Sequence, residues 1–157
     1  LKDHPDANVK FLIAGGGPNL PELIELVKKL NREDRIIFTD RIEPTDAPYY
    51  YQLGDCYVSA STTETQGLTF MEAMASSLPL LVRYDESLTN LIDNNENGYF
   101  YFDSSEFSSQ LEKIRTLSPQ ERERVVQNGY KTLEPYSMEH FYQSIHEVYT
   151  RACKKNY

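Results

Sequence analysis

Short apolar runs alternate along the chain with longer amphipathic stretches. A short apolar run bounded by turn residues is typical of a buried strand, and five such runs predict five strands. We expect the last of them at a sheet edge. The runs are VKFLIAGG (Val9–Gly16), RIIFTD (Arg35–Asp40), CYVSAS (Cys56–Ser61), LPLLVR (Leu78–Arg83) and GYFYF (Gly98–Phe102).

Between and after these runs, apolar residues recur at helical spacing. We expect Asn19 to cap the first helix, with Glu22 as its capping-box partner. The expected helices are Leu20–Asn31, Ala47–Leu53, Leu68–Ser77, a short one over 87–94, and three at the C-terminal end over 106–117, 120–133 and 138–155. The caps expected for the last three are Ser104 or Ser105, Ser118 with Pro119, and Ser137.

This alternation of strands and helices predicts an α/β fold with a doubly wound, mostly parallel, Rossmann-like sheet. The chain of 157 residues, 39% of them hydrophobic, suits a single domain over 1–157. We expect the C-terminal helices, including the stripe of Phe141, Ile145, Val148 and Ala152, to pack within the protein. Sheets of this kind bind ligands at the carboxyl ends of their strands.

Charge and cysteine content exclude several classes of function. The net charge of −8 argues against a nucleic-acid partner, which would need a basic face. Cys56 and Cys153 are expected to be ordinary reduced thiols, and the three histidines show no metal spacing. No secretory signal and no apolar run of membrane-spanning length occurs, so we expect a soluble, cytoplasmic protein; peripheral membrane contact stays open.

The turn AGGGP follows the first expected strand. Adjacent glycines such as Gly16 and Gly17 allow a ligand to approach the backbone closely. The full dinucleotide pattern G-x-G-x-x-G is absent, because Leu20 stands where the third glycine would be. A simple strand-to-helix turn explains this segment about as well as a binding site does.

The stretch STTETQGLTFMEAMA combines a glycine helix start with two carboxylates. Glu72 lies in an otherwise apolar run, so burial would require a partner for it. The amides of Gly67, Leu68 and Thr69 would form an anion site at the helix start. Glu72 could bind the diol of a ribose, and Glu64 another part of the same ligand. On spacing alone, a capping role for Glu64 and a solvated or ion-paired Glu72 is the somewhat stronger explanation.

The longer segment SASTTETQGLTFMEAMASSLP resembles the E-x7-E signature of glycosyltransferase family four, whose members have the two-domain GT-B fold. The residues that match the family pattern are Ser61, Glu64, Gly67, Glu72, Ala73, Ala75 and Pro79. LIAGGGP, DCYVSAS, DNNENGYFY and YSMEHFYQSIHEVY also resemble family segments, so the similarity covers nearly the whole chain. The segment TETQGLTFMEA is most similar to the corresponding segment of bacterial glucosyltransferases that act on diacylglycerol.

The resemblance implies a role for each candidate residue. Glu64 would contact donor-sugar hydroxyls in the reaction centre as the catalytic carboxylate, and Glu72 would hold the ribose. The 67–69 amides would line the diphosphate and sugar, and the backbone around Ile42 would touch the base. The implied reaction retains the anomeric configuration, uses a nucleotide-sugar such as UDP-glucose, and needs neither metal nor cofactor.

Three departures from the family pattern stand out. Ser77 replaces a glycine, and Gln66 replaces an aromatic residue or proline at the sugar side of the site. The arginine and lysine that grip the diphosphate in the family have no counterpart in LKDHPDAN, where Lys2 stands alone. The resemblance therefore implies the C-terminal, donor-binding part of a larger enzyme, whose N-terminal domain would bind a lipid or glycan acceptor. Association of that enzyme with the inner face of the membrane stays open.

Two alternatives stay open. One is a family member that builds capsule, lipopolysaccharide or a protein-linked glycan. The other is a non-catalytic nucleotide-binding or interaction module, because fold alone does not fix function. The presence of both Glu64 and Glu72 favours the enzyme. A phosphate-binding receiver-like protein is disfavoured, because no acidic cluster follows the first expected strand.

Overall fold

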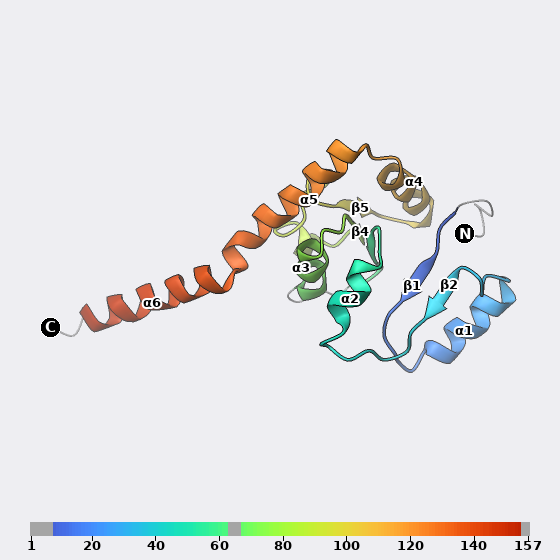
Figure 1. Cartoon of the computed structure of the whole chain (residues 1–157), viewed down its shortest axis with the longest axis horizontal. Coiled ribbons are helices and arrows are strands. Elements are labelled where there is room, and N and C mark those ends of the chain that lie inside the picture. The colour runs from blue at the N-terminus through green and yellow to red at the C-terminus, as the bar shows by residue number, and fades with distance from the viewer. Residues whose placement is uncertain (1–7, 63–66, 155–157) are drawn as a thin grey trace. The chain divides into compact units, whose positions relative to one another are not determined.

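The computed structural model describes residues 8–62 and 67–154. The chain forms two compact units, Leu1–Gly54 and Asp55–Tyr157, which we call the first and the second unit. Figure 1 shows the elements of both units in chain order.

The first unit is a small parallel sheet with two helices. Strands β1 and β2 pair in parallel, with Phe11 opposite Ile36 and Ile13 opposite Phe38. A helix between two parallel strands is the crossover that such pairing requires. The elements are β1 (Phe11–Ile13), α1 (Leu20–Lys29), β2 (Ile36–Phe38) and α2 (Ala47–Gln52).

Helix α1 begins where the sequence predicts but not by the predicted cap. Asn19 has helical backbone angles and its side chain makes no capping hydrogen bond, so the expected capping box with Glu22 is wrong. Proline in the first turn and lysines in the last turn suit the two ends of the helix. Val27 is its one buried residue among those described, and Leu26 stays half exposed.

The second unit contains a three-stranded parallel sheet in the order β3-β4-β5. Residues 57–59 of β3 pair with 80–82 of β4, and 81–83 of β4 with 99–101 of β5. The first elements are β3 (Tyr57–Ser59), α3 (Leu68–Ala75), β4 (Leu80–Arg83), the 3-10 turn η1 (Glu86–Leu88) and β5 (Tyr99–Tyr101). The helix expected over 87–94 is therefore only this short turn, and β5 lies at the sheet edge as predicted.

The core of the second unit lies around β4 and β5. Leu80, Leu81 and Val82 are fully buried, as are Phe70 of α3 and Val125 of α5 (Pro119–Leu133). Gly129 of α5 faces Met74 of α3, where an added Cβ would make an ordinary van der Waals contact at 3.5 Å from the methionine side chain.

The remaining C-terminal elements are α4 (Ser104–Arg115), η2 (Glu134–Tyr136) and α6 (Met138–Lys154). Asp103 caps α4 by accepting hydrogen bonds from the amides of Ser105 and Glu106, so the serine cap expected there is wrong. A carboxylate one residue earlier reaches the same orphan amides and also suits the positive end of the helix. The capping box of Ser118 and Glu121 at α5 is present.

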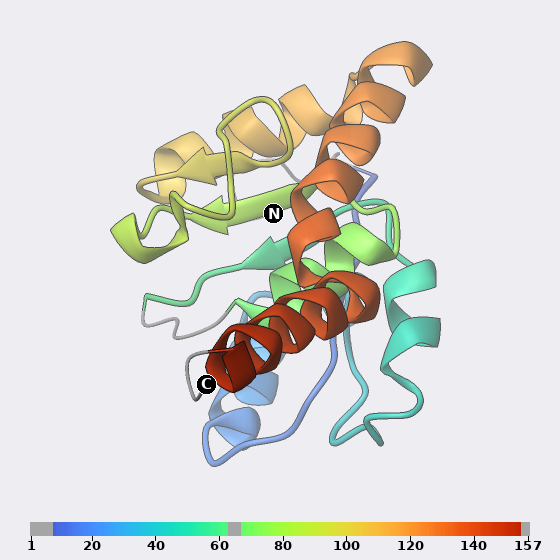
Figure 2. The ribbon, with the colours of Figure 1, turned by 90° about the vertical axis from the view of Figure 1, so that its left-hand side faces the viewer.

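Helix α6 does not pack as expected. Ser137 accepts a hydrogen bond from the amide of His140, which supports its predicted role at the start of the helix. However, no residue of α6 is buried, and Phe141 and Val148 are 59% and 65% exposed. Figure 2 shows α6 as the dark red helix that leads to the C-terminus. The expected apolar stripe exists, but no described part of the chain covers it. Across 8–62 and 67–154, no helix combines the length and apolar character that crossing a membrane requires.

Parallel strands alternating with helices confirm the predicted α/β class. The described strands nevertheless form two sheets rather than one. Strand β1 pairs only with β2, and β3 only with β4, so each has one edge without a partner strand among the described residues. Because both the AGGGP turn and the α3 start follow carboxyl ends of strands, the sequence predicts that they share one sheet edge, and this stays a prediction.

Candidate functional site

The glycine turn of the first unit is held against the segment that follows β2. The amide of Gly15 donates to the carbonyl of Asp40 at 3.0 Å, and the amide of Thr39 donates to the carbonyl of Ile13 at 3.1 Å. Gly15 has a φ of +127°, a conformation that only glycine adopts readily. The carboxyl ends of β1 and β2 are thus joined by their own backbone.

The space around Gly16 differs from the space around Gly17. A Cβ on Gly16 would lie 2.7 Å from Oδ1 of Asp40, an atom that accepts a hydrogen bond from the amide of Arg41. Packing within the chain therefore explains Gly16. Around Gly17, a Cβ would meet nothing within 4 Å, so its bare backbone remains approachable for a ligand.

Sequence reasoning missed Arg41. This residue is exposed and lies beside Gly16, immediately before the half-buried Ile42. Among the described residues its guanidinium makes no hydrogen bond or ion pair. The only sequence signal was a lone basic residue directly after a strand, at the edge where ligands bind. The structure thus brings Gly16, Arg41 and Ile42 together in one unit.

In the second unit, Gly67 starts α3 in a left-handed conformation with φ of +67°. Its carbonyl accepts the amides of Phe70 and Met71, both at 3.1 Å. A Cβ here would lie 2.9 Å from Cδ2 of Leu91, so both conformation and space require glycine. Within the described residues, no hydrogen bond from the amides of Gly67 or Leu68 is found, as expected for the first turn of a helix.

Glu72 lies one turn into α3 on its exposed side, although Phe70 and Ala73 on the same helix are fully buried. The burial that the apolar run around Glu72 suggested is therefore wrong. Phe70, Ala73 and Met74 point into the core, whereas Glu72 is on the exposed side. Its carboxylate is accessible to a ligand.

Of the remaining candidate residues, two are described by the structure and two are not. Thr69 and Leu68 are exposed beside Gly67, with Leu68 at 58%. Glu64 and Gln66 lie outside the described residues, so their predicted roles at the sugar end stay predictions.

The cysteines do not contribute a reactive group to the candidate site. Cys56 and Cys153 are both free thiols. Burial raises the pKa of Cys56 to about 12, which keeps it protonated at neutral pH and chemically inert. In the described ranges, no three side chains of histidine, cysteine, aspartate or glutamate gather as metal ligands.

Comparison with known proteins assigns this arrangement to a family. The family model for glycosyl transferases group 1 matches residues 1–132. The chain belongs to the glycosyl transferases group 1 family. The resemblance drawn from the E-x7-E signature is thereby confirmed.

Two relatives of this glycosyltransferase chain carry the same name. An alpha-monoglucosyldiacylglycerol synthase of Acholeplasma laidlawii is 34% identical over 155 residues, 99% of this chain and 38% of that protein. An alpha-monoglucosyldiacylglycerol synthase of Streptococcus pneumoniae is 34% identical over 148 residues, 94% of this chain and 33% of that protein. The chain thus spans about a third of the length of these relatives.

Solved structures agree with the glycosyltransferase fold. The C-terminal domain of the group 1 glycosyl transferase LpcC from Francisella tularensis is 28% identical, with a TM-score of 0.65 over 76% of this chain and 63% of that one. HepE from Anabaena, solved in complex with UDP-glucose, has a TM-score of 0.80 at 18% identity over 96% of this chain and 43% of that one. At that identity the likeness shows the fold alone.

Proposed function

We propose that this chain is the donor-binding part of a retaining glycosyltransferase that uses UDP-glucose. The observation that carries the proposal is the start of α3. There, Gly67 opens a helix, the amides of Gly67 and Leu68 make no hydrogen bond within the described residues, and the exposed Glu72 follows one turn later. An anion site next to a carboxylate suits a diphosphate next to a ribose.

In this proposal, different residues bind different parts of the UDP-glucose donor. The amides of Gly67, Leu68 and Thr69 bind the diphosphate and the sugar, and Glu72 accepts hydrogen bonds from the ribose hydroxyls. In the first unit, Gly16 and Gly17 admit the donor to the backbone, and the backbone around Ile42 contacts the base. Arg41 adds a positive charge beside this glycine turn, which favours an anionic ligand there.

Glu64 supplies the carboxylate of the reaction centre. Transfer with retention places positive charge on the anomeric carbon, and a carboxylate that contacts the sugar stabilises that charge most in the transition state. The departing UDP carries the opposite charge. Helix amides and a guanidinium stabilise it as a metal ion would, so this chemistry needs no metal.

The acceptor in this proposal is a lipid or a glycan, held by a separate N-terminal domain of the whole enzyme. Support comes from the two synthases named for monoglucosyldiacylglycerol, of which this chain spans about a third. Other relatives are named for different products, including a mannosylfructose-phosphate synthase, so membership of the family leaves the acceptor open. With a lipid acceptor the enzyme would work at the inner face of the membrane.

The test is a titration of the isotope-labelled chain with UDP-glucose, followed by amide chemical shifts. We expect shifts to centre on 15–17 and 67–69, and to be smaller with glucose 1-phosphate, which lacks the base and the ribose. Glu72→Gln should reduce the shifts, whereas Glu139→Gln, an exposed carboxylate on α6, should not. Shifts that avoid both glycine turns, or equal binding of the two compounds, would overturn the proposal.

A further inference from the structure

A pocket of about 440 Å³ opens in the second unit at the carboxyl ends of its strands. Ala60 follows β3, Arg83 ends β4, and residues 101–104 lead from β5 into α4; all of them line the pocket. Ligand pockets commonly measure about 300 to 1,000 Å³, so a small molecule of one ring fits. None of the residues assigned above to the donor lines it.

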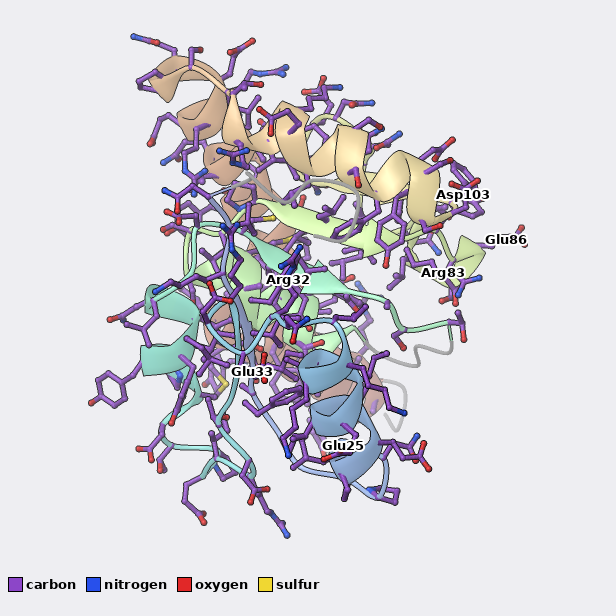
Figure 3. All side chains as sticks on the ribbon, turned by 90° about the vertical axis from the view of Figure 1, so that its right-hand side faces the viewer. Glu25, Arg32, Glu33, Arg83, Glu86 and Asp103 are labelled. Atoms are coloured by element: carbon purple, nitrogen blue, oxygen red, sulfur yellow. The ribbon has the colours of Figure 1, made fainter. Side chains whose placement is uncertain are left out.

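Arg83 is the cation of this pocket. Its side chain is exposed, and within the described residues it makes no hydrogen bond or ion pair. Figure 3 labels Arg83 and Asp103 at this end of the strands, and both line the pocket. Tyr101 offers no competing group, because its hydroxyl already donates to the carbonyl of Ser59 at 3.2 Å. The five donors of the guanidinium are therefore available to a ligand.

An aromatic surface lies beside Arg83. Phe102 is 57% exposed although it is apolar, and it stacks on Tyr84 with ring centroids 4.7 Å apart and planes at 25°. Phe107 holds the ring of Tyr101 edge-on at 5.1 Å on the α4 side of the pocket. Stacking fixes the orientation of Phe102, so a flat apolar face is prearranged next to polar groups.

The surrounding charges disfavour a phosphate. Four carboxylates surround the one cation that lines the pocket, Arg83. Asp103 lines the pocket itself, and Asp85, Glu86 and Glu106 lie within three residues of a lining residue in the chain. Three of them are fixed by backbone amides: Asp85 by Ser87 at 2.9 Å, Asp103 by Ser105 at 2.8 Å, and Glu106 by Phe102 at 3.1 Å. A polyanion would be repelled by these fixed negative charges. A neutral ligand that both accepts and donates hydrogen bonds meets no such cost.

We propose that this pocket binds a neutral pyranose. Arg83 donates to ring or hydroxyl oxygens, and Oδ2 of Asp103 accepts from a sugar hydroxyl, because Oδ1 is the oxygen that caps α4. Ser104 adds a hydroxyl, and Phe102 covers the C–H face of the ring. Binding does not depend on the donor site.

The experiment titrates the labelled 157-residue chain with methyl α-D-glucopyranoside in the absence of nucleotide. We expect saturable amide shifts at 83, 102 and 104, with a dissociation constant on the order of millimolar, as for a small polar ligand in an open site. Arg83→Met and Phe102→Ala should each weaken binding by about fivefold or more. Both side chains are exposed, and the unchanged amide spectrum elsewhere establishes that the variants are folded.

Matched controls separate this site from general effects. Arg115→Met, at the other end of α4, and Tyr136→Ala, an equally exposed aromatic residue, should leave sugar binding unchanged. Inorganic phosphate is the second probe. Shifts at Arg83 with phosphate but not with the sugar would make this an anion site and overturn the proposal, as would sugar shifts that ignore Arg83 and Phe102. If the chain binds methyl α-D-glucopyranoside but not UDP-glucose, the result contradicts the proposed donor site and leaves the sugar pocket supported.

Discussion

The carboxylate of Glu72 is exposed on the helix that also carries the buried Phe70. Its proposed contact with two ribose hydroxyls uses charge, so the amide of Glu72→Gln should weaken donor binding by about 2–4 kcal/mol. Isothermal titration calorimetry of the intact enzyme measures this loss. Unchanged affinity would remove the ribose role from Glu72.

Glu64 should behave differently from Glu72. A carboxylate that acts on a developing positive charge contributes more to the transition state than to the bound donor. Glu64→Gln should therefore lower kcat by a larger factor than it raises the donor KM. Initial rates over a range of donor concentrations separate the two constants, and an effect confined to KM would contradict the catalytic role.

Gly67 permits a clear test of stability. In Gly67→Ala, the left-handed conformation costs about 1–2 kcal/mol, and the Cβ would stand 2.9 Å from Leu91. We expect the free energy of unfolding in urea to fall by about 2–4 kcal/mol once overpacking is included. Gly17→Ala is the control: its Cβ meets nothing within 4 Å, and its stability should stay within about 0.5 kcal/mol of the parent.

At the scale of elements, the capping box at the start of α5 should contribute measurably to the stability of the second unit. The hydroxyl of Ser118 accepts the amide of Glu121, and the glutamate side chain accepts the Ser118 amide. Ser118→Ala should destabilise the second unit by about 1 kcal/mol, because one first-turn amide loses its acceptor. Thermal unfolding checks this, with Ser109→Ala in the middle of α4 as the neutral comparison. An equal shift in both variants would mean that the cap contributes nothing.

The helix caps show which capping residues can be predicted from the local sequence and which cannot. Ser118 was predicted correctly, because Ser-Pro followed by glutamate is a strong local pattern. At α4, three polar residues stand in a row, and which of Asp103, Ser104 and Ser105 takes the cap depends on where β5 ends. Propensity alone could not choose among them. At α1, the Asn19 backbone is already helical, so its side chain never reaches the amides.

At the scale of the whole molecule, we expect the 157-residue chain alone to transfer no sugar and to bind UDP-glucose weakly. A reaction centre formed with an acceptor domain cannot be assembled by the donor part alone. Each missing charge-assisted contact to the diphosphate removes about 1.5–3 kcal/mol, and two of them raise the dissociation constant by about two to four decades. Arg41 replaces part of this loss if it reaches the donor.

Titration calorimetry and a radiolabel transfer assay with diacylglycerol test that expectation. Micromolar affinity for UDP-glucose, or any turnover by the chain alone, would contradict it. Within the described residues, β1 and β3 each have one edge without a partner strand, and the apolar stripe of α6 is exposed. We therefore also predict self-association at high concentration. Sedimentation velocity over a concentration series measures that tendency.

The sequence by itself determined the order and type of nearly all elements, the family, and the glycine at the start of α3. These features are local: apolar periodicity, turn chemistry and the spacing of a signature depend on residues near one another in the chain. The tertiary structure alone decided burial and proximity. It placed Glu72 on the exposed side of α3 and set Arg41 against the glycine turn. It also gathered Arg83, Phe102 and Asp103 around one pocket, because the ends of separate strands meet only when the sheet forms.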